Sequence, residues 1–366
     1  MTVFRAHDPA WYLQRLALPG GRLRVVVDTD AANEIDDQFA LAWVLLSLDR
    51  FALEGVYAAP FSFAHRRQEM IRARQARDNP SAASPSDLAL LHNYADRIAG
   101  YENKGWALET MSLAAFDPPD VGMERSYVEI LTVFEKLRMP PDGLVFRGTP
   151  GYLASPAQAH SSEAVEHLIR TARKGTDADP LYVLALGCVT NIACALLLAP
   201  DIIDKVVVVW TSGYPSHAPQ TNDSFNLEQD MVASTVLLDS GVPLVYLPGY
   251  QVGAQLRLSL PEMETYVRGR GAIGDYLFQL FTHNPLWEFA GIDSFYAHSW
   301  VIWDVINVAW LLNPAWVPSA IVPTPVLGSD RRWRQAAGRH PMREGYAVAR
   351  DAIFRDFFRK LEKAPA

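Results

Sequence analysis

The sequence has little that would support a disulfide-stabilised or membrane-spanning protein. Only two of the 366 residues are cysteines, Cys188 and Cys194, and both lie in an apolar stretch. A disulfide framework or a thiolate zinc site needs more cysteines, so we expect inert core thiols and a reducing, cytoplasmic location. No uninterrupted apolar stretch is long enough to span a bilayer, and the N-terminal residues lack the apolar core of a signal peptide.

The chain also lacks an excess of positive charge. Its net charge is −8, and it contains no long run of basic residues. Nucleic acid and anionic membranes are therefore poor partners, whereas a small neutral ligand meets no electrostatic opposition. With 49% hydrophobic and 20% charged residues, the composition is ordinary for a globular protein. We expect one domain over residues 1–366, since α/β folds often reach this length as a single unit.

Apolar strand patterns alternate with helical patterns along most of the chain. The alternation predicts an α/β fold, with an open, mainly parallel, twisted sheet flanked by helices on both faces, as in Rossmann-like proteins. The expected strands are at 23–27, 54–60, 143–146, 181–186, 205–210, 243–247 and 320–326. Residues 64–116 are less regular and begin with a basic stretch, which we interpret as a solvated face. We interpret this segment as an insertion or lid.

Four aspartates lie within ten residues, where the first expected strand gives way to a helix. They are Asp28, Asp30, Asp36 and Asp37, in the sequence VVVDTDAANEIDDQFAL. One aspartate at a helix start is usually a cap, but four exceed what capping requires. Carboxylates this close repel one another, and a hard cation bound among them removes that cost. Because ligands of open α/β sheets bind at the carboxyl ends of strands, this run predicts a metal site.

Three later segments could complete such a site. LGCVTNIA (186–193) follows a buried strand and could offer a backbone carbonyl, although a turn of this kind is more often structural. QTNDSFNLEQD (220–230) carries Asn222, Ser224 and Asn226, whose amides and hydroxyl suit sugar hydroxyls, but solvated loops are also polar. Asp304 is a lone acid in the apolar helical pattern of residues 298–314, so it pairs either with a base or with a metal.

Taken together, these segments resemble the nucleoside hydrolase family, the inosine–uridine-preferring N-ribohydrolases. The family motif DxDPGxDDxxAL is similar to DTDAANEIDDQFAL, in which the Pro-Gly linker is replaced and lengthened by two residues. The family's GPLTN, EFN and HDPLAVA correspond in order to GCVTN (187–191), SFN (224–226) and WDVINVA (303–309). The resemblance covers residues 24 to about 314.

The resemblance implies a calcium-dependent hydrolase that cleaves the N-glycosidic bond of a ribonucleoside or related N-riboside. It implies that Ca²⁺ is held by Asp30, Asp37, the Thr190 carbonyl and Asp304. Asp30 would also accept the proton of the attacking water, Asp36 and Asn226 would bind ribose hydroxyls, and Asp28 would support these ligands. The resemblance further implies a homodimer or homotetramer.

The chain departs from the family pattern at the two ends of the expected substrate. The histidine that helps to protonate the departing base is Trp303 here, and the glutamate that binds the 5′-hydroxyl is Ser224. The family's ribose-binding asparagine after the second strand is either replaced by Ser62 or absent. Candidates for stacking on the base are Trp303, Trp300 and Trp287, and candidate replacement acids are His298, His283, His65 and Glu124.

Two other functions fit parts of the sequence. A calcium site could persist in a nucleoside- or sugar-binding protein without activity, because fold does not fix function. VVVDTD also resembles the strand-end DxD of haloacid-dehalogenase-type phosphatases, although the IDDQFAL continuation is foreign to them. Release of free ribose from a nucleoside would separate hydrolase from binder.

Overall fold

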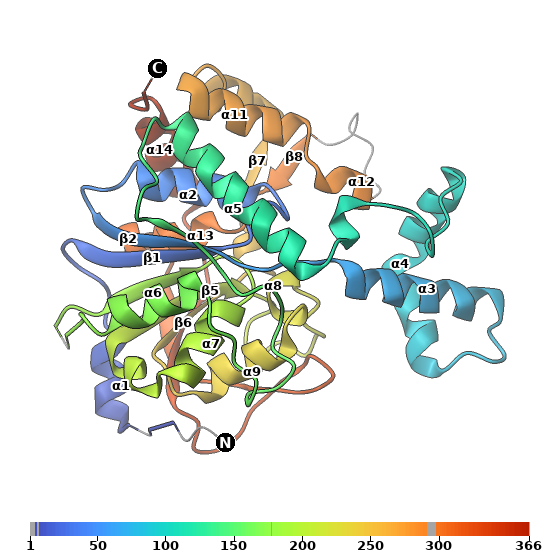
Figure 1. The fold of residues 1–366 in the computed structure, drawn as a ribbon, viewed down its shortest axis with the longest axis horizontal. Coiled ribbons are helices and arrows are strands. Elements are labelled where there is room, and N and C mark those ends of the chain that lie inside the picture. The colour runs from blue at the N-terminus through green and yellow to red at the C-terminus, as the bar shows by residue number, and fades with distance from the viewer. Residues whose placement is uncertain (1–3, 6, 177, 291–297, 366) are drawn as a thin grey trace.

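The central feature of the structure is an eight-stranded sheet with strand order β3-β2-β1-β4-β5-β6-β12-β9 (Figure 1). The computed structural model describes residues 4–5, 7–176, 178–290 and 298–365. All strand pairs of this sheet are parallel except β9–β12, which is antiparallel. The strands are β1 (Leu23–Thr29), β2 (Phe51–Ala58), β3 (Val145–Arg147), β4 (Leu181–Ala185), β5 (Val206–Ser212), β6 (Leu244–Pro248), β9 (Ser319–Pro323) and β12 (Pro341–Gly345). The prediction of an open, mainly parallel α/β sheet is therefore confirmed.

Helices cover both faces of the sheet, and the period-two alternation of the strands explains why. In β1, Val25 and Val27 join one apolar cluster, whereas Val26 between them joins the other. The first cluster packs against α2, α5, α11, α13 and α14, and the second against α6, α7 and α9. The α-helices are α1 (Pro9–Arg15), α2 (Asp36–Leu45), α3 (Ala64–Asp78), α4 (Pro85–Asn103), α5 (Pro119–Lys136), α6 (Glu163–Ala172), α7 (Thr190–Leu198), α8 (Phe225–Glu228), α9 (Met231–Asp239), α10 (Leu260–Glu262), α11 (Gly271–Thr282), α12 (Leu286–Ala290), α13 (Val305–Leu312) and α14 (Arg350–Leu361).

The order of the strands reverses between β1 and β4. From β1 the chain moves outward to β2 and β3, and it then returns to the other side of β1 with β4. Helices that follow neighbouring strands on the two sides of such a point diverge and leave a crevice at the carboxyl ends of the strands. The aspartate run follows β1, so it lies at this crevice.

Residues 64–116 differ from the expected irregular segment, because they contain two long helices, α3 and α4, that pack against each other. Met70 on α3 and Ile98 and Tyr101 on α4 are buried in a small apolar cluster of their own. Ion pairs join Arg72 to Asp87 and, at 2.7 Å, Arg77 to Glu102 across the hairpin. The density of charged residues hid the helical periodicity in the sequence. Figure 1 shows the hairpin projecting to one side of the main body.

The C-terminal part also holds structure that the sequence analysis did not anticipate. The strand expected at 320–326 is β9, which lies at the edge of the sheet, and β12 inserts between β6 and β9. The structure also contains two small two-stranded sheets besides the central one. One is formed by β7 (Arg257–Ser259) with β8 (Ser299–Val301), and the other by β10 (Val326–Leu327) with β11 (Trp333–Arg334).

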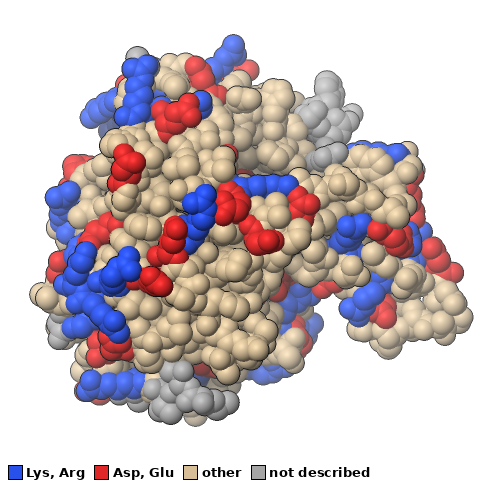
Figure 2. All heavy atoms as spheres, viewed as in Figure 1, with Lys and Arg blue, Asp and Glu red and all other residues tan. Residues whose placement is uncertain are grey.

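The surface carries charges of both signs. Figure 2 shows acidic and basic side chains interspersed over the face in view. Among the described residues, none of the helices combines the length and the apolar character needed to cross a membrane.

Candidate active site

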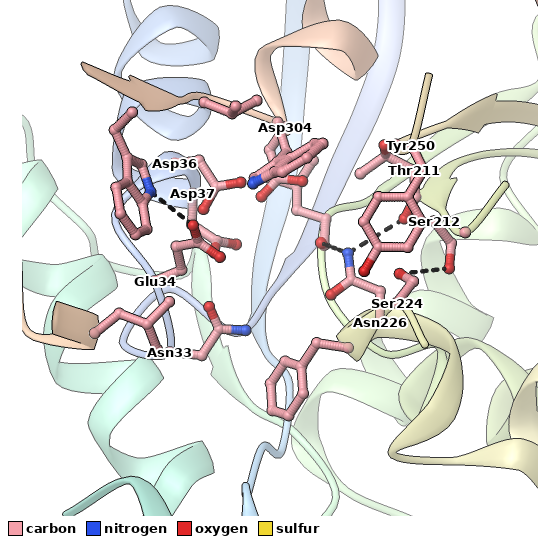
Figure 3. Close-up of a pocket in the computed structure, with 18 of the residues that line it drawn as sticks. Asn33, Glu34, Asp36, Asp37, Thr211, Ser212, Ser224, Asn226, Tyr250 and Asp304 are labelled. Atoms are coloured by element: carbon pink, nitrogen blue, oxygen red, sulfur yellow. Dashed lines mark hydrogen bonds between the residues drawn. The ribbon is translucent and has the colours of Figure 1, made fainter. Parts of the chain in front are cut away.

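A cavity of about 540 Å³ opens at the carboxyl ends of β1, β4, β5 and β6. Its walls are formed by the loop after β1, by residues at or just beyond the ends of the other strands, and by the segment that leads into α13. Residues of the α3–α4 hairpin and of α12 complete the lining. Acidic side chains gather on one side, and amide and hydroxyl side chains from residues 211–226 face them across the cavity (Figure 3).

Three carboxylates from distant parts of the chain converge on the acidic side. Asp36 and Asp37 open helix α2, and Asp304 is the residue immediately before α13. Each of the three offers an oxygen within 4.8 Å of the other two, and all three residues are buried. Thr29 at the end of β1 donates a hydrogen bond to Asp37 and so fixes its position. The expected meeting of the N-terminal acidic run with Asp304 therefore occurs.

This arrangement is electrostatically costly without a cation. Burial, together with repulsion from neighbouring carboxylates, holds the pKa values of Asp36, Asp37 and Asp304 well above their usual range. Among the described residues, Oδ1 of Asp36 and Oδ1 of Asp304 are buried without a hydrogen-bond partner. Unpartnered carboxylate oxygens that converge fit a hard divalent cation such as Ca²⁺, which takes oxygen ligands.

Asp30 is placed differently from these three acids. It is fully buried but does not line the cavity. Its Oδ2 accepts hydrogen bonds from Asn33 at 2.6 Å and Gln229 at 3.3 Å, while Oδ1 has no partner among the described residues. Burial raises the pKa of Asp30 to about 6. Gly187 permits this position, because a Cβ there would approach Oδ1 of Asp30 to 2.5 Å.

Asp28 and Thr190 lie beneath the cavity rather than in its lining. Asp28 accepts a hydrogen bond from Asn191 at 2.8 Å, and burial raises its pKa to about 8. Thr190 opens α7, and its hydroxyl donates to Asp230 at 2.7 Å. A nucleophilic role for Asp28, as the phosphatase interpretation requires, gains no support from this buried position.

On the opposite wall, Asn226 has a fixed orientation. Its amide nitrogen donates to the carbonyls of Leu186 and Thr211, so its oxygen is left facing the cavity (Figure 3). Ser224 also lines the cavity, with its hydroxyl 3.1 Å from that of Ser212. Both side chains can therefore meet a ligand that is rich in hydroxyl groups.

Two other expected substrate contacts are used elsewhere. Asn222 accepts from the Tyr214 amide at 2.7 Å and donates to the Arg331 carbonyl at 2.9 Å. Ser62 accepts from the Ala64 amide at 3.1 Å at the start of α3. Neither side chain lines the cavity.

Glu34 is a cavity residue that the sequence analysis missed. It lies in the loop that is two residues longer than the family motif, and Trp300 donates a hydrogen bond to it at 2.7 Å (Figure 3). Burial, and then repulsion from Asp37, raises the pKa of Glu34 to about 7. Hydrogen bonds from Trp300 and Trp303 lower this pKa and so offset part of the rise. The presence of Glu34 in the acidic run was the available signal. The four histidine and glutamate candidates for a leaving-group acid all lie outside the cavity lining, and so does Trp287.

Comparison with known proteins decides the family. The model of the inosine-uridine preferring nucleoside hydrolase family matches residues 107–351, about two thirds of the chain. The chain belongs to this family. The region that matches the nucleoside hydrolase model contains Thr190, Ser224, Asn226 and Asp304. The aspartates of residues 28–37 precede this region.

Curated relatives and solved structures agree with this membership. A pyrimidine-specific ribonucleoside hydrolase RihB of Shigella flexneri is 27% identical over 161 residues, which are 43% of this chain and 49% of that protein. The chain thus spans about half the length of the curated relatives it matches. The fold is similar to those of the inosine-uridine preferring nucleoside hydrolase of Bacillus anthracis (TM-score 0.57, 18% identity, covering 93% of this chain and 99% of that one) and of the purine-preferring ribonucleoside hydrolase of Gardnerella vaginalis (TM-score 0.59, 17% identity, covering 93% and 98%).

Proposed function

We propose that this protein hydrolyses the N-glycosidic bond of a ribonucleoside or related N-riboside to free base and ribose, and that it requires Ca²⁺. The observation that carries the proposal is the convergence of Asp36, Asp37 and Asp304 on one side of a cavity whose opposite wall presents Asn226 and Ser224. Among the described residues, Asp36 and Asp304 each have one buried oxygen without a hydrogen-bond partner. Family membership supports the reaction class.

The acidic side would hold the cation. Asp37 and Asp304 would be ligands through their carboxylates, and the Thr190 carbonyl is a further proposed ligand. Asp36 converges with these two acids and would take the place among the ligands that the resemblance gives to Asp30, which lies outside the cavity lining. When bound, Ca²⁺ would supply positive charge that orients the sugar hydroxyls and makes the attacking water easier to deprotonate.

The chain's own residues would position the sugar and the water. Asn226 would accept a hydrogen bond from one ribose hydroxyl through its outward-facing oxygen, and Asp36 would accept one from another. The carboxylates beside the sugar would stabilise the positive charge that develops on its ring as the C–N bond breaks. Asp30 is the proposed base that accepts a proton from the attacking water.

Aromatic side chains would bind the base. Phe225 and Phe289 both pack on Phe63 at one side of the cavity, with ring centroids 4.0 and 4.4 Å from that of Phe63, and Trp303 also lines the cavity. A planar base is well suited to stacking on such rings. Stacking would hold the departing base, and water would supply its proton.

Binding without hydrolysis is the competing proposal. Two observations favour it. Asp30 lies outside the cavity lining and accepts a hydrogen bond from Asn33, which does line the cavity, and Trp303 stands at the place of the family histidine. A small-molecule nucleoside is the partner in both proposals. Assembly into a dimer or tetramer and a cytoplasmic location stay predictions from the sequence.

A panel assay separates the two proposals. Purine, pyrimidine and modified nucleosides would be incubated with the Ca²⁺-loaded protein, and free ribose would be measured as reducing sugar. Ribose release that chelation abolishes supports the hydrolase. Saturable nucleoside binding without ribose release for every member of the panel contradicts it.

A further inference from the structure

The helical hairpin α3–α4 gives the cavity a basic wall. Arg66 on α3 and Arg97 on α4 both line the cavity, next to the aromatic rings of Phe63, Phe225 and Phe289. The acidic side is supplied by the loop after β1 and by Asp304, so the cavity is strongly polarised. A third arginine of the lining, Arg257, is exposed and donates to Ser299 at 3.1 Å.

The charge of Arg66 is neutralised within the protein. Its Nε donates to Glu228 at 2.6 Å, and a second nitrogen donates to the Asp223 carbonyl at 2.9 Å. Glu228 also receives Arg331 and, at 3.2 Å, His65. The single negative charge of this buried carboxylate is thus already shared among several basic groups, so it cannot also neutralise another arginine.

Arg97 is a half-buried arginine of the cavity lining and, unlike Arg66, it has no acidic partner among the described residues. Its guanidinium lies 4.5 Å from the ring centroid of Phe289 and 5.9 Å from that of Tyr94. Within the part of the chain that the structure describes, it forms no ion pair, and its Nε is buried without a hydrogen-bond partner. Burial, then repulsion from Arg66, lowers its pKa. A half-buried guanidinium without an anion is costly, and an anion delivered by a ligand would offset that cost.

We propose that the ligand of this cavity is an N-riboside that carries an anionic group, either a phosphate on the sugar or a carboxylate on the base, and that Arg97 pairs with this anion. The inference rests on the proposed function for the ribosyl part of the ligand. The acidic side repels an anion, so the anionic group faces the hairpin while the sugar hydroxyls face Asp36 and its neighbours. A planar guanidinium matches phosphate and carboxylate oxygens with paired hydrogen bonds.

The test compares two pairs of ligands that cannot be hydrolysed at an N-glycosidic bond. Calorimetry with the Ca²⁺-loaded protein would measure ribose against ribose 5-phosphate, and uracil against orotate. We expect the anionic member of one pair to bind on the order of 10- to 100-fold more tightly, the effect of a charge-assisted hydrogen bond. The pair that responds identifies whether the anion belongs to the sugar or to the base.

Variants assign the preference to Arg97. Arg97→Gln removes the preference and leaves Ca²⁺ binding unchanged, and Arg97→Lys retains part of the preference. Arg72→Gln, at an exposed arginine of α3 outside the cavity lining, retains all of it. Equal affinities within both pairs overturn the inference, as does a preference that survives in a folded Arg97→Gln protein. If Arg97→Gln does not fold, the wild-type comparison and Arg97→Lys decide. Hydrolysis is measured separately, so Arg97-dependent anion binding without ribose release rejects the proposed function but keeps the anion site.

Discussion

Replacing Asp304 by Asn should change calcium binding and metal-free stability in opposite directions. The substitution keeps the shape of the side chain and one carbonyl oxygen but removes one of the three converging charges. An ion held by these oxygens would lie about 2.4 Å from each. At that distance a divalent charge attracts one carboxylate by about 3.5 kcal/mol even at the dielectric constant of water. Since the amide retains part of this attraction, we expect Ca²⁺ affinity to fall on the order of 100-fold.

The same substitution relieves repulsion when no ion is bound. The acidic oxygens lie within 4.8 Å of one another. Two unit charges at that separation repel by about 0.9 kcal/mol at the dielectric constant of water, and Asp304 faces two such neighbours. At pH 8 without metal, the melting temperature of Asp304→Asn should therefore exceed that of the wild type by about 2 °C.

Calcium titration by calorimetry and metal-free thermal unfolding measure the two effects. Asp142→Asn, which removes an exposed acid far along the sequence from these residues, is the matched control and should change neither quantity. An unchanged calcium titration of Asp304→Asn would refute Asp304 as a ligand. A lower metal-free melting temperature would refute the idea that repulsion dominates this cluster.

Three further predictions follow from the same geometry. Because the folded-state pKa of Glu34 is raised to about 7 and those of Asp36, Asp37 and Asp304 are also raised, the metal-free folded protein binds more protons than the unfolded chain above about pH 4. These groups therefore stabilise the metal-free folded protein at low pH, and this stabilisation is lost as pH rises towards 7 and beyond. Between pH 5 and 8 the melting temperature should fall more steeply for the wild type than for Asp304→Asn. Parallel curves of melting temperature against pH would contradict this. Glu34→Gln keeps an acceptor for Trp300 but removes a charge beside Asp37, so Ca²⁺ affinity should fall by less than in Asp304→Asn, and an unchanged titration would count against it. Asp30→Asn should lower kcat on the order of 10²- to 10⁴-fold with the protein still folded, the usual contribution of a general base, and near-normal turnover would exclude Asp30 from that role.

The sequence predicted the fold well because its strong signals are local. Continuous apolar, β-branched runs such as Val206–Trp210 are typical of buried strands in a parallel sheet with both faces covered, and the structure has a strand there. The strand β12 was missed because it has little apolar character (Pro-Met-Arg-Glu-Gly), and it owes its place to pairing with β6 and β9 rather than to its own residues.

The acidic side of the site was also accessible from the sequence, whereas its basic side was not. Two of the three converging acids stand next to each other at a helix start, and the third is a lone charge in an apolar stretch, immediately before α13, so the sequence pattern marks them. Arg66 and Arg97 lie within a charged segment, where nothing distinguishes an arginine that faces a cavity from one that faces solvent. Their roles depend on how the α3–α4 hairpin docks, and that docking is set by tertiary contacts.

The sequence likewise could not predict that Asp30 lies outside the cavity lining. The replaced and lengthened loop after β1 places Asn33 and Glu34 in the lining, while Asp30 is retained beside Gly187. Counting the two additional residues reveals a change of loop but not which side chains it presents.

A crystal structure grown with Ca²⁺ and ribose would test the central claim most directly. We expect one ion, with oxygens of Asp36, Asp37 and Asp304 at about 2.3–2.6 Å from it and sugar hydroxyls completing its shell. Density for the sugar with no ion among these carboxylates, or an ion bound only by other residues, would contradict it.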